Sequence, residues 1–279
     1  MTQRTIWGAM VLALAFSLAV GCKHKGSDAG TDSGGAVTDS GATDSGGAVT
    51  DSGGGLPPDS GTTATLIINV TEVFNDSIQD GVAIDLFDRA DVAEATSLAS
   101  GTTDAAGNAT LMVDVAGGPV NGYFKLTKAT FKNTYHYDNY PTAVSAVQSR
   151  PIVSDTTWGL FVGLVPTPMG ADMGDGNYDA ASESIGAFVT VDCAGNPVMG
   201  ATVTTTSGSV RYVSAAGFPD GTLMATSANG QFIVFELGTG PQTVSVTFPS
   251  TPAGCAGTTA DDVMDVRADS PVLGTVLVP

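Results

Sequence analysis

The sequence predicts an all-β protein with two small antiparallel β-sandwich domains behind a long segment that cannot fold by itself. Three observations support this prediction. Residues 31–55 repeat Thr-Asp-Ser-Gly and contain no aromatic side chain. After residue 63, Val, Ile, Thr and aromatic residues recur at every second position between turns of Gly, Asn, Asp and Pro, which is typical of short strands. The same strand-like segments also occur twice in the same order, and few residues favour helices.

The first 21 residues carry the features of an export signal. Arg4 and the amino terminus supply positive charge, and the apolar run Trp7–Val20 is too short to cross a bilayer comfortably. The sequence Leu18-Ala19-Val20-Gly21-Cys22 then resembles the lipobox of bacterial lipoproteins. This resemblance implies that Cys22 becomes the first mature residue and carries a diacylglycerol, usually with a further acyl chain, which anchors the protein stably in a membrane.

The lipobox also implies a location in the bacterial cell envelope, with the outer membrane as the expected site of the lipid. Whether the chain faces the periplasm or the outside stays open. Ordinary signal cleavage beside Gly21, which would leave a soluble exported protein, is the alternative interpretation.

Residues 22–63 are predicted to form a disordered tether behind the lipidated Cys22. Val37 and Val49 are the only branched aliphatic residues of the repeat, so the segment cannot bury enough apolar surface to offset the entropy of ordering. Its Asp residues have no basic partner after Lys25 and repel one another, which extends the chain. A calcium-binding acidic repeat is the alternative, but single Asp residues spaced in this way do not build a cage of oxygen ligands.

The internal repeat divides the remaining chain into a first domain at residues 64–168, a linker at 169–184 and a second domain at 185–279. Five segments recur in order. They are 66–70, 81–86, 103–111, 123–127 and 164–166 in the first domain, and 187–191, 200–204, 226–234, 243–248 and 277–279 in the second. Short strands between frequent turns favour a small sandwich for each domain. Residues 91–99 are expected to form a loop insertion.

Stretches of both predicted domains carry a family resemblance. The stretches "GVAIDLF…TDAAGNATL" and "CAGNPVMGATVTTTSG…TSANGQFIVFEL" resemble the carboxypeptidase regulatory-like, or transthyretin-like, β-sandwich domains. In that pattern Gly107 and Gly230 would adopt positive φ in hairpin turns. The resemblance names no active site, and it implies a domain used for stability, adhesion or spacing.

The cysteine count supports the anchor and predicts a disulfide. Lipidation of Cys22 leaves an even pair, Cys193 and Cys255, in an oxidising compartment. Each of the two follows the end of a predicted strand in a flexible segment, where their β-carbons can meet. The bond would close a loop of about 62 residues inside the second domain.

The sequence carries no pattern of catalytic residues, so we predict no enzyme activity, no catalytic residue and no cofactor. His24 and His136 are the only histidines, and His24 lies in the tether. Zinc-protease, dithiol, nucleophile-elbow and phosphate-loop motifs are absent from the sequence. The net charge of −18 argues against nucleic acid as a partner, because its phosphates would be repelled.

Asp175, Asn177 and Asp179 form a candidate metal site in the predicted linker. Their spacing at every second position matches the start of a calcium loop. An EF-hand would also need Gly and Glu where Ala180 and Gly186 stand. A solvated linker is therefore the competing interpretation.

A candidate ligand site is the stretch Thr134–Pro141, the most aromatic part of the mature chain. Exposed Tyr135, Tyr137 and Tyr140 would stack on a sugar or anchor a protein partner. The competing interpretation is a strand that packs Tyr135 and Tyr137 into the sandwich.

Together these features predict a membrane-anchored exported lipoprotein with a non-catalytic structural, adhesive or protein-interaction role. Its expected partners are the membrane, through the lipid, and an envelope or cell-surface protein or glycan. A carbohydrate- or small-ligand-binding lipoprotein that uses residues 135–140 is the alternative function. An accessory protein of a hydrolase is the third.

Overall fold

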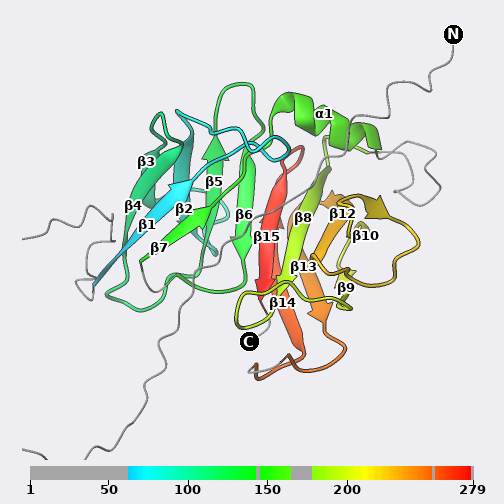
Figure 1. Ribbon diagram of the computed structural model, residues 1–279. Coiled ribbons are helices and arrows are strands. Elements are labelled where there is room, and N and C mark those ends of the chain that lie inside the picture. The colour runs from blue at the N-terminus through cyan, green and yellow to red at the C-terminus, as the bar shows by residue number, and fades with distance from the viewer. Residues whose placement is uncertain (1–61, 143–144, 165–177, 253–254, 278–279) are drawn as a thin grey trace, which may run out of the picture.

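The computed structural model describes residues 62–142, 145–164, 178–252 and 255–277 (Figure 1). We call strands β1 to β7 the first module and β8 to β15 the second. The first module comprises β1 (Thr63–Asn69), β2 (Ala83–Asp88), β3 (Ser97–Thr102), β4 (Asn108–Asp114), β5 (Gly122–Thr127), β6 (Thr134–Asp138) and β7 (Ala146–Ser149). The second comprises β8 (Glu183–Val191), β9 (Thr202–Thr205), β10 (Ser209–Val213), β11 (Pro219–Asp220), β12 (Gln231–Gly238), β13 (Gly240–Thr247), β14 (Thr259–Val266) and β15 (Val272–Leu277). The predicted all-β class is confirmed, and α1 (Asp155–Leu164) is the one helix of the described residues.

The two modules repeat one strand topology. The order β4-β1-β7 in the first module corresponds to β12-β8-β15 in the second. In each, the last strand of the order (β7 or β15) pairs parallel to the central strand (β1 or β8). The order β6-β5-β2 likewise corresponds to β14-β13-β9. Two strands differ. Strand β3 pairs with β2 while β10 pairs with β12, and β11, which pairs with β10, has no counterpart among the described strands of the first module. The internal repeat seen in the sequence is therefore a repeat of strand order.

The repeat extends to individual hydrogen bonds around two buried threonines. Thr103 Oγ1 accepts from the Val82 N–H at 2.9 Å and donates to the Gln79 carbonyl at 2.8 Å. Thr226 Oγ1 accepts from the Ala201 N–H at 2.9 Å and donates to the Val198 carbonyl at 2.7 Å. The same hydroxyl clamp thus joins equivalent loops in both modules.

The glycines expected to take positive φ do so at equivalent turns. Gly107 has φ 75° and Gly230 has φ 67°. A Cβ at Gly230 would lie 2.5 Å from the Thr190 carbonyl oxygen, and one at Gly107 would lie 3.0 Å from that of Val70. The close backbone approach, together with the left-handed conformation, requires glycine at both turns.

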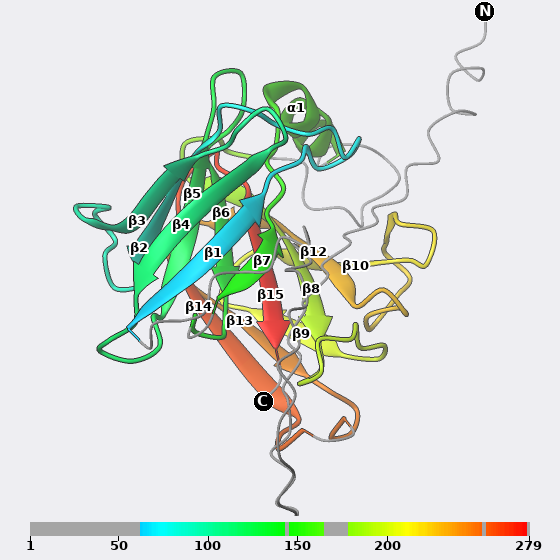
Figure 2. The same cartoon turned by 60° about the vertical axis from the view of Figure 1, so that its left-hand side comes forward.

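The modules share one nine-stranded sheet, in the order β11-β10-β12-β8-β15-β6-β5-β2-β3. The link is the parallel pairing of β15 with β6, in which Leu273 lies opposite His136. Figures 1 and 2 show β15 between β8 and β6 in the middle of the molecule. Backbone hydrogen bonds therefore join the two modules into one body.

The two smaller sheets pack against the shared sheet from opposite faces. Adjacent residues of β5 show the division, because Phe124 belongs to the core beneath β4-β1-β7 and Tyr123 to the core beneath β14-β13-β9. The core that contains Tyr123 also contains Phe188 and Phe232 of the second module, so it extends from the second module onto the first. Strands β5 and β6 are consequently buried on both faces.

Helix α1 is missing from the sequence prediction. Ser154 caps it, since its Oγ accepts from the Thr157 N–H at 3.1 Å, and Asp155 lies in the first turn, where a carboxylate is favourable. Trp158 and Phe161 of the helix pack against the shared sheet. The prediction that residues 164–166 close the first repeat is wrong, because Leu164 ends α1 and the closing strand is β7.

Replacing either clamp threonine should destabilise the protein by a similar amount. Thr103→Val and Thr226→Val each leave a buried N–H without its acceptor, which costs about 1–3 kcal/mol. Urea unfolding followed by Trp158 fluorescence measures this loss. Thr204→Val on the exposed side of β9 is the control and should stay within about 0.5 kcal/mol. A loss at only one of the two clamps would show that the repeated bonds are not energetically equivalent.

Candidate functional site

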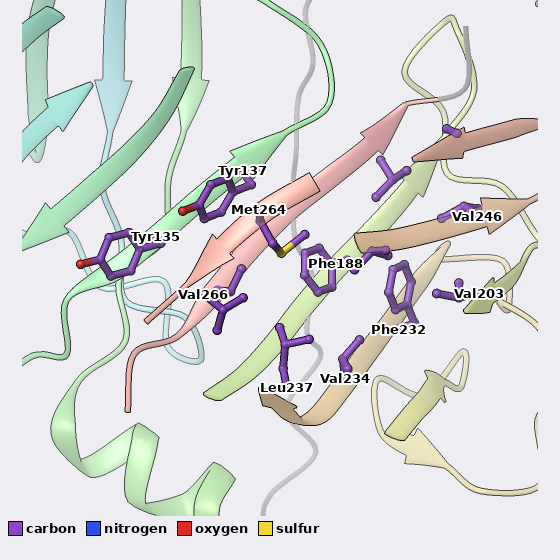
Figure 3. Close-up of a cluster of buried hydrophobic side chains, with 14 of the residues drawn as sticks. Tyr135, Tyr137, Phe188, Val203, Phe232, Val234, Leu237, Val246, Met264 and Val266 are labelled. Atoms are coloured by element: carbon purple, nitrogen blue, oxygen red, sulfur yellow. The ribbon is translucent and has the colours of Figure 1, made fainter. Parts of the chain in front are cut away.

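The tyrosines of β6 lie inside the protein, at the junction of the modules. Tyr135 and Tyr137 of β6 lie beside Met264 and Val266 of β14 (Figure 3) and belong to the same buried cluster. The Tyr137 ring stacks on Tyr123 with centroids 5.0 Å apart. This placement favours the packing interpretation of the stretch, because neither buried ring presents a face to a ligand.

The hydroxyls of both tyrosines are used within the protein. Tyr137 OH donates to the Asp265 carbonyl at 2.9 Å, and Tyr135 OH donates to Glu94 Oε1 at 3.0 Å. Burial raises the pKa of both phenols, so they stay protonated at neutral pH. Tyr140, which follows β6, is half-buried.

Arg89 is the central cation of the junction. It extends from the end of β2 and forms an ion pair with Asp262, whose side chain is fully buried in β14. The same guanidinium donates to the carbonyl of Val263 at 3.0 Å and to the carbonyl of Asp138. One side chain of the first module therefore binds the second module and β6 together.

A second ion pair cluster surrounds Glu94 in the loop before β3. Its carboxylate pairs with Lys125 of the first module and lies 3.6 Å from Arg267 of the second. Glu94 has φ 55°, an uncommon conformation for a residue with a side chain. Asp91 holds this loop in place by accepting the N–H groups of Ala95 and Thr96. The backbone conformation thus places the Glu94 carboxylate between two cations.

The opposite face of β6 carries a buried polar set. Asp138 forms an ion pair with Arg150, and His136 Nε2 lies 2.7 Å from the Pro151 carbonyl, to which it donates. Burial, and then the charge of Arg150, lowers the pKa of His136 to about 3. Burial alone would raise the pKa of Asp138, but Arg150 holds it below its usual value. His136 is therefore neutral and Asp138 ionised at neutral pH.

A small cavity adjoins this polar set where β6, β15 and β8 meet. His136, Ser149, Arg150 and Thr275 line it, together with apolar residues that include Leu273. No group of three or more His, Cys, Asp or Glu side chains placed to hold a metal ion occurs within the described residues. The histidine donates to a carbonyl and the carboxylate is paired with arginine, so both groups are engaged in holding the junction.

The predicted disulfide is confirmed. Cys193 and Cys255 are bonded, with their α-carbons 5.5 Å apart. Cys193 lies in the turn after β8, and Cys255 lies in the connection between β13 and β14. The bond therefore joins the two sheets of the second module at one end.

Several predicted sites lie outside the described residues. Cys22, Asp175 and Asn177 are among them. Asp179 is described and sits in an exposed turn, where its carboxylate accepts from the Ala181 N–H at 3.0 Å and from the Ser182 hydroxyl at 2.6 Å. No helix in the described part of the chain is long and apolar enough to cross a membrane.

Arg89, Arg150 and Asp262 are the junction residues that sequence reasoning missed. Their local sequence contains no motif. The available signal was the scarcity of cations, because an isolated arginine in so acidic a chain has many carboxylates to pair with.

Comparison with known proteins adds likenesses of low score. No family model and no curated protein matches the chain. The Bacillus anthracis TIE protein is 12% identical with a TM-score of 0.25, over 78% of this chain and 34% of that one. Shaft pilin SpaA from Lactobacillus rhamnosus GG is 9% identical with a TM-score of 0.23, over 78% and 98%. The 3-chlorocatechol 1,2-dioxygenase of Rhodococcus opacus 1CP is 18% identical with a TM-score of 0.23, over 34% and 60%.

This chain thus spans about a third of the TIE protein, as the coverage of 34% states. All three TM-scores lie far below the level at which a shared fold follows. Neither a function nor a site is transferred to this chain from these proteins.

Truncating Tyr137 should strongly destabilise the protein. Tyr137→Ala removes a stacked ring from the core and is expected to cost about 3–5 kcal/mol. Tyr137→Phe keeps the ring and loses only the bond to the Asp265 carbonyl, so its cost should be about 1 kcal/mol. Thermal melts of both variants check this, and a wild-type melt for Tyr137→Ala would contradict the core position.

The pH dependence of stability should reveal two junction residues, Asp262 and His136, whose titrations change the stability in opposite directions. Burial raises the pKa of Asp262 to about 6, although Arg89 partly opposes the rise. Its folded pKa exceeds the unfolded value, so its contribution favours folding at low pH and is lost as pH rises toward 6. His136 has a depressed pKa, so its contribution is present above about pH 6.5 and is lost on acidification.

Asp262→Asn should therefore leave the effect of His136 on the pH dependence of stability unopposed by Asp262. Between pH 4 and 6 the variant is expected to lose stability on acidification more steeply than wild type, by about 1.4 kcal/mol per pH unit at most. Urea unfolding at several pH values measures the two slopes. Parallel slopes would show that Asp262 does not titrate in this window.

Removing the disulfide should lower the free energy of unfolding, because the unfolded chain gains conformational entropy. Cys193→Ser with Cys255→Ser opens a loop of 62 residues and should cost about 4 kcal/mol in the chain-entropy model. Denaturant unfolding measures the loss. Mass spectrometry of the unreduced wild type should show the two cysteines linked, and free thiols that alkylate without reductant would be the contrary result.

Proposed function

We propose that this protein is an exported, lipid-anchored protein of the bacterial envelope with a non-catalytic structural or adhesive role. In this proposal Cys22 carries the lipid at the start of the tether predicted at residues 22–63, whose last residue, Thr63, begins β1. The two joined modules are the part that is displayed. We further propose that both modules are transthyretin-like domains, on the strength of the sequence motifs around Gly107 and Gly230.

The observation that carries the structural role is the use made of the reactive side chains. His136 donates to a carbonyl, Asp138 pairs with Arg150, and Asp262 pairs with Arg89. The two tyrosines of β6 are stacked and hydrogen-bonded in the core. The Arg89–Asp262 pair and the Tyr137 hydroxyl bridge the two modules, and the other contacts hold β6 in place within the first. A rigid spacer or display protein requires such a fixed joint.

The anchor can be tested by substituting its cysteine. Cys22→Ser removes the acceptor of the lipid, so uncleaved precursor should accumulate and the mature membrane-bound form should disappear. Fractionation and mass spectrometry of the amino-terminal peptide measure both effects, and Ser27→Ala in the same region is the control. If Cys22→Ser is processed and enters the detergent phase as wild type does, the anchor is wrong.

A further inference from the structure

The outer side of sheet β4-β1-β7 carries exposed apolar side chains and one charged residue, Asp114 at the end of β4. Register places Ile67 of β1 directly between Thr110 of β4 and Val147 of β7, with Met112 diagonal to it. Met112 is 67% exposed and Val147 is 48% exposed. We call this surface, defined by Ile67, Thr110, Met112 and Val147, the open face.

The equivalent surface of the second module is an interface. Met112 and Phe235 both lie five residues after the equivalent glycines 107 and 230, and Thr110 and Ile233 lie three residues after them. Phe235 and Ile233 are buried beneath Trp158 and Phe161 of α1. In one copy of the repeat, this side of the sheet is therefore covered by apolar packing.

The open face is also where two copies of this acidic chain can approach each other. Twenty-two acidic and seven basic residues follow position 61, which leaves a net charge of −15 on this part. On the outward side of β4, β1 and β7, Asp114 at the end of β4 is the one charged residue of these described strands. The other small sheet carries Asp261 on its exposed side. Like-charge repulsion between two copies is thus weak at the open face.

We propose that the open face is a docking surface for a second copy of this chain, packed face to face. A two-fold axis along β1 places Ile67 over Ile67 of the other copy and brings each Met112 toward the opposite Val147, so the contact is self-complementary. The patch is small, and the dimer is weak in solution. This part rests on the proposed function: lipid anchors confine the copies to one membrane, which raises their effective concentration.

Cysteine crosslinking of the full chain in its own membranes tests the proposal. Ile67→Cys places a thiol at the two-fold axis and should give, on mild oxidation, a covalent dimer with at least ten times the yield of Val263→Cys. Val263 is the matched control, since it is 52% exposed on the outer side of the other small sheet. The wild-type chain shows the background from its own cysteines.

A second pair of variants tests the surface itself. Adding Met112→Asp to Ile67→Cys should reduce the dimer yield at least tenfold, whereas adding Val263→Asp should leave it unchanged. Thr110→Asp, also on the open face, repeats the test if Met112→Asp melts at a lower temperature. Equal yields from Ile67→Cys and Val263→Cys would overturn the proposal, and so would a product whose mass is not twice that of the chain.

The crosslinking result can be separated from the fate of the anchor. If fractionation finds the chain outside the membrane, the proposed anchor fails. The same oxidation on the concentrated soluble protein then still compares Ile67→Cys with Val263→Cys and decides whether the face pairs.

Discussion

The parallel pairing of β15 with β6 is the constraint on which the rest of the structure depends. It inserts the last strand of the chain between β8 and a strand of the first module. Strand β6 then has neighbours on both edges and protein on both faces, and all five of its residues are buried. Each polar atom of that strand must find a partner inside the protein. The His136, Asp138 and tyrosine contacts follow from this requirement.

The placement of the cations follows from the same joint. Ten basic residues minus Arg4, Lys23 and Lys25 leave seven after residue 61. Three of these pair across the modules, as Arg89 does with Asp262, Lys132 with Asp269 and Arg267 with Glu94. A chain with so few cations concentrates them where buried or half-buried carboxylates would otherwise be unpaired. The acidic surface beyond the junction is left to solvent.

The sequence predicted the strand class, the repeat, the turn glycines and the disulfide, because each depends on local pattern or on counting. It did not predict α1, since Gly159 and the run Thr156–Thr157 are poor helix formers and the stabilising contacts of Trp158 come from β8 and β12. The Arg89–Asp262 pair joins residues 173 positions apart, and no local pattern encodes such a contact. Tyr135 and Tyr137 show the limit most clearly. Period-two alternation predicted that both side chains lie on one face of the strand. That face is buried only because strands of the second module pack against it.

The way the modules join also bears on whether a further unit of the same kind could pair with their free edges. The joint is heterologous, because it uses β15 of one module and the non-equivalent edge strand β6 of the other. A joint of this kind can continue from unit to unit unless the free edges are blocked. The equivalent of β6 in the second module is β14, and its edge carbonyls at Val263 and Asp265 accept from Arg89 and from the Tyr137 hydroxyl. The equivalent of β15 in the first module is β7, which has only four residues. The side chains that hold the two modules together therefore also cap the edge at which a third could add.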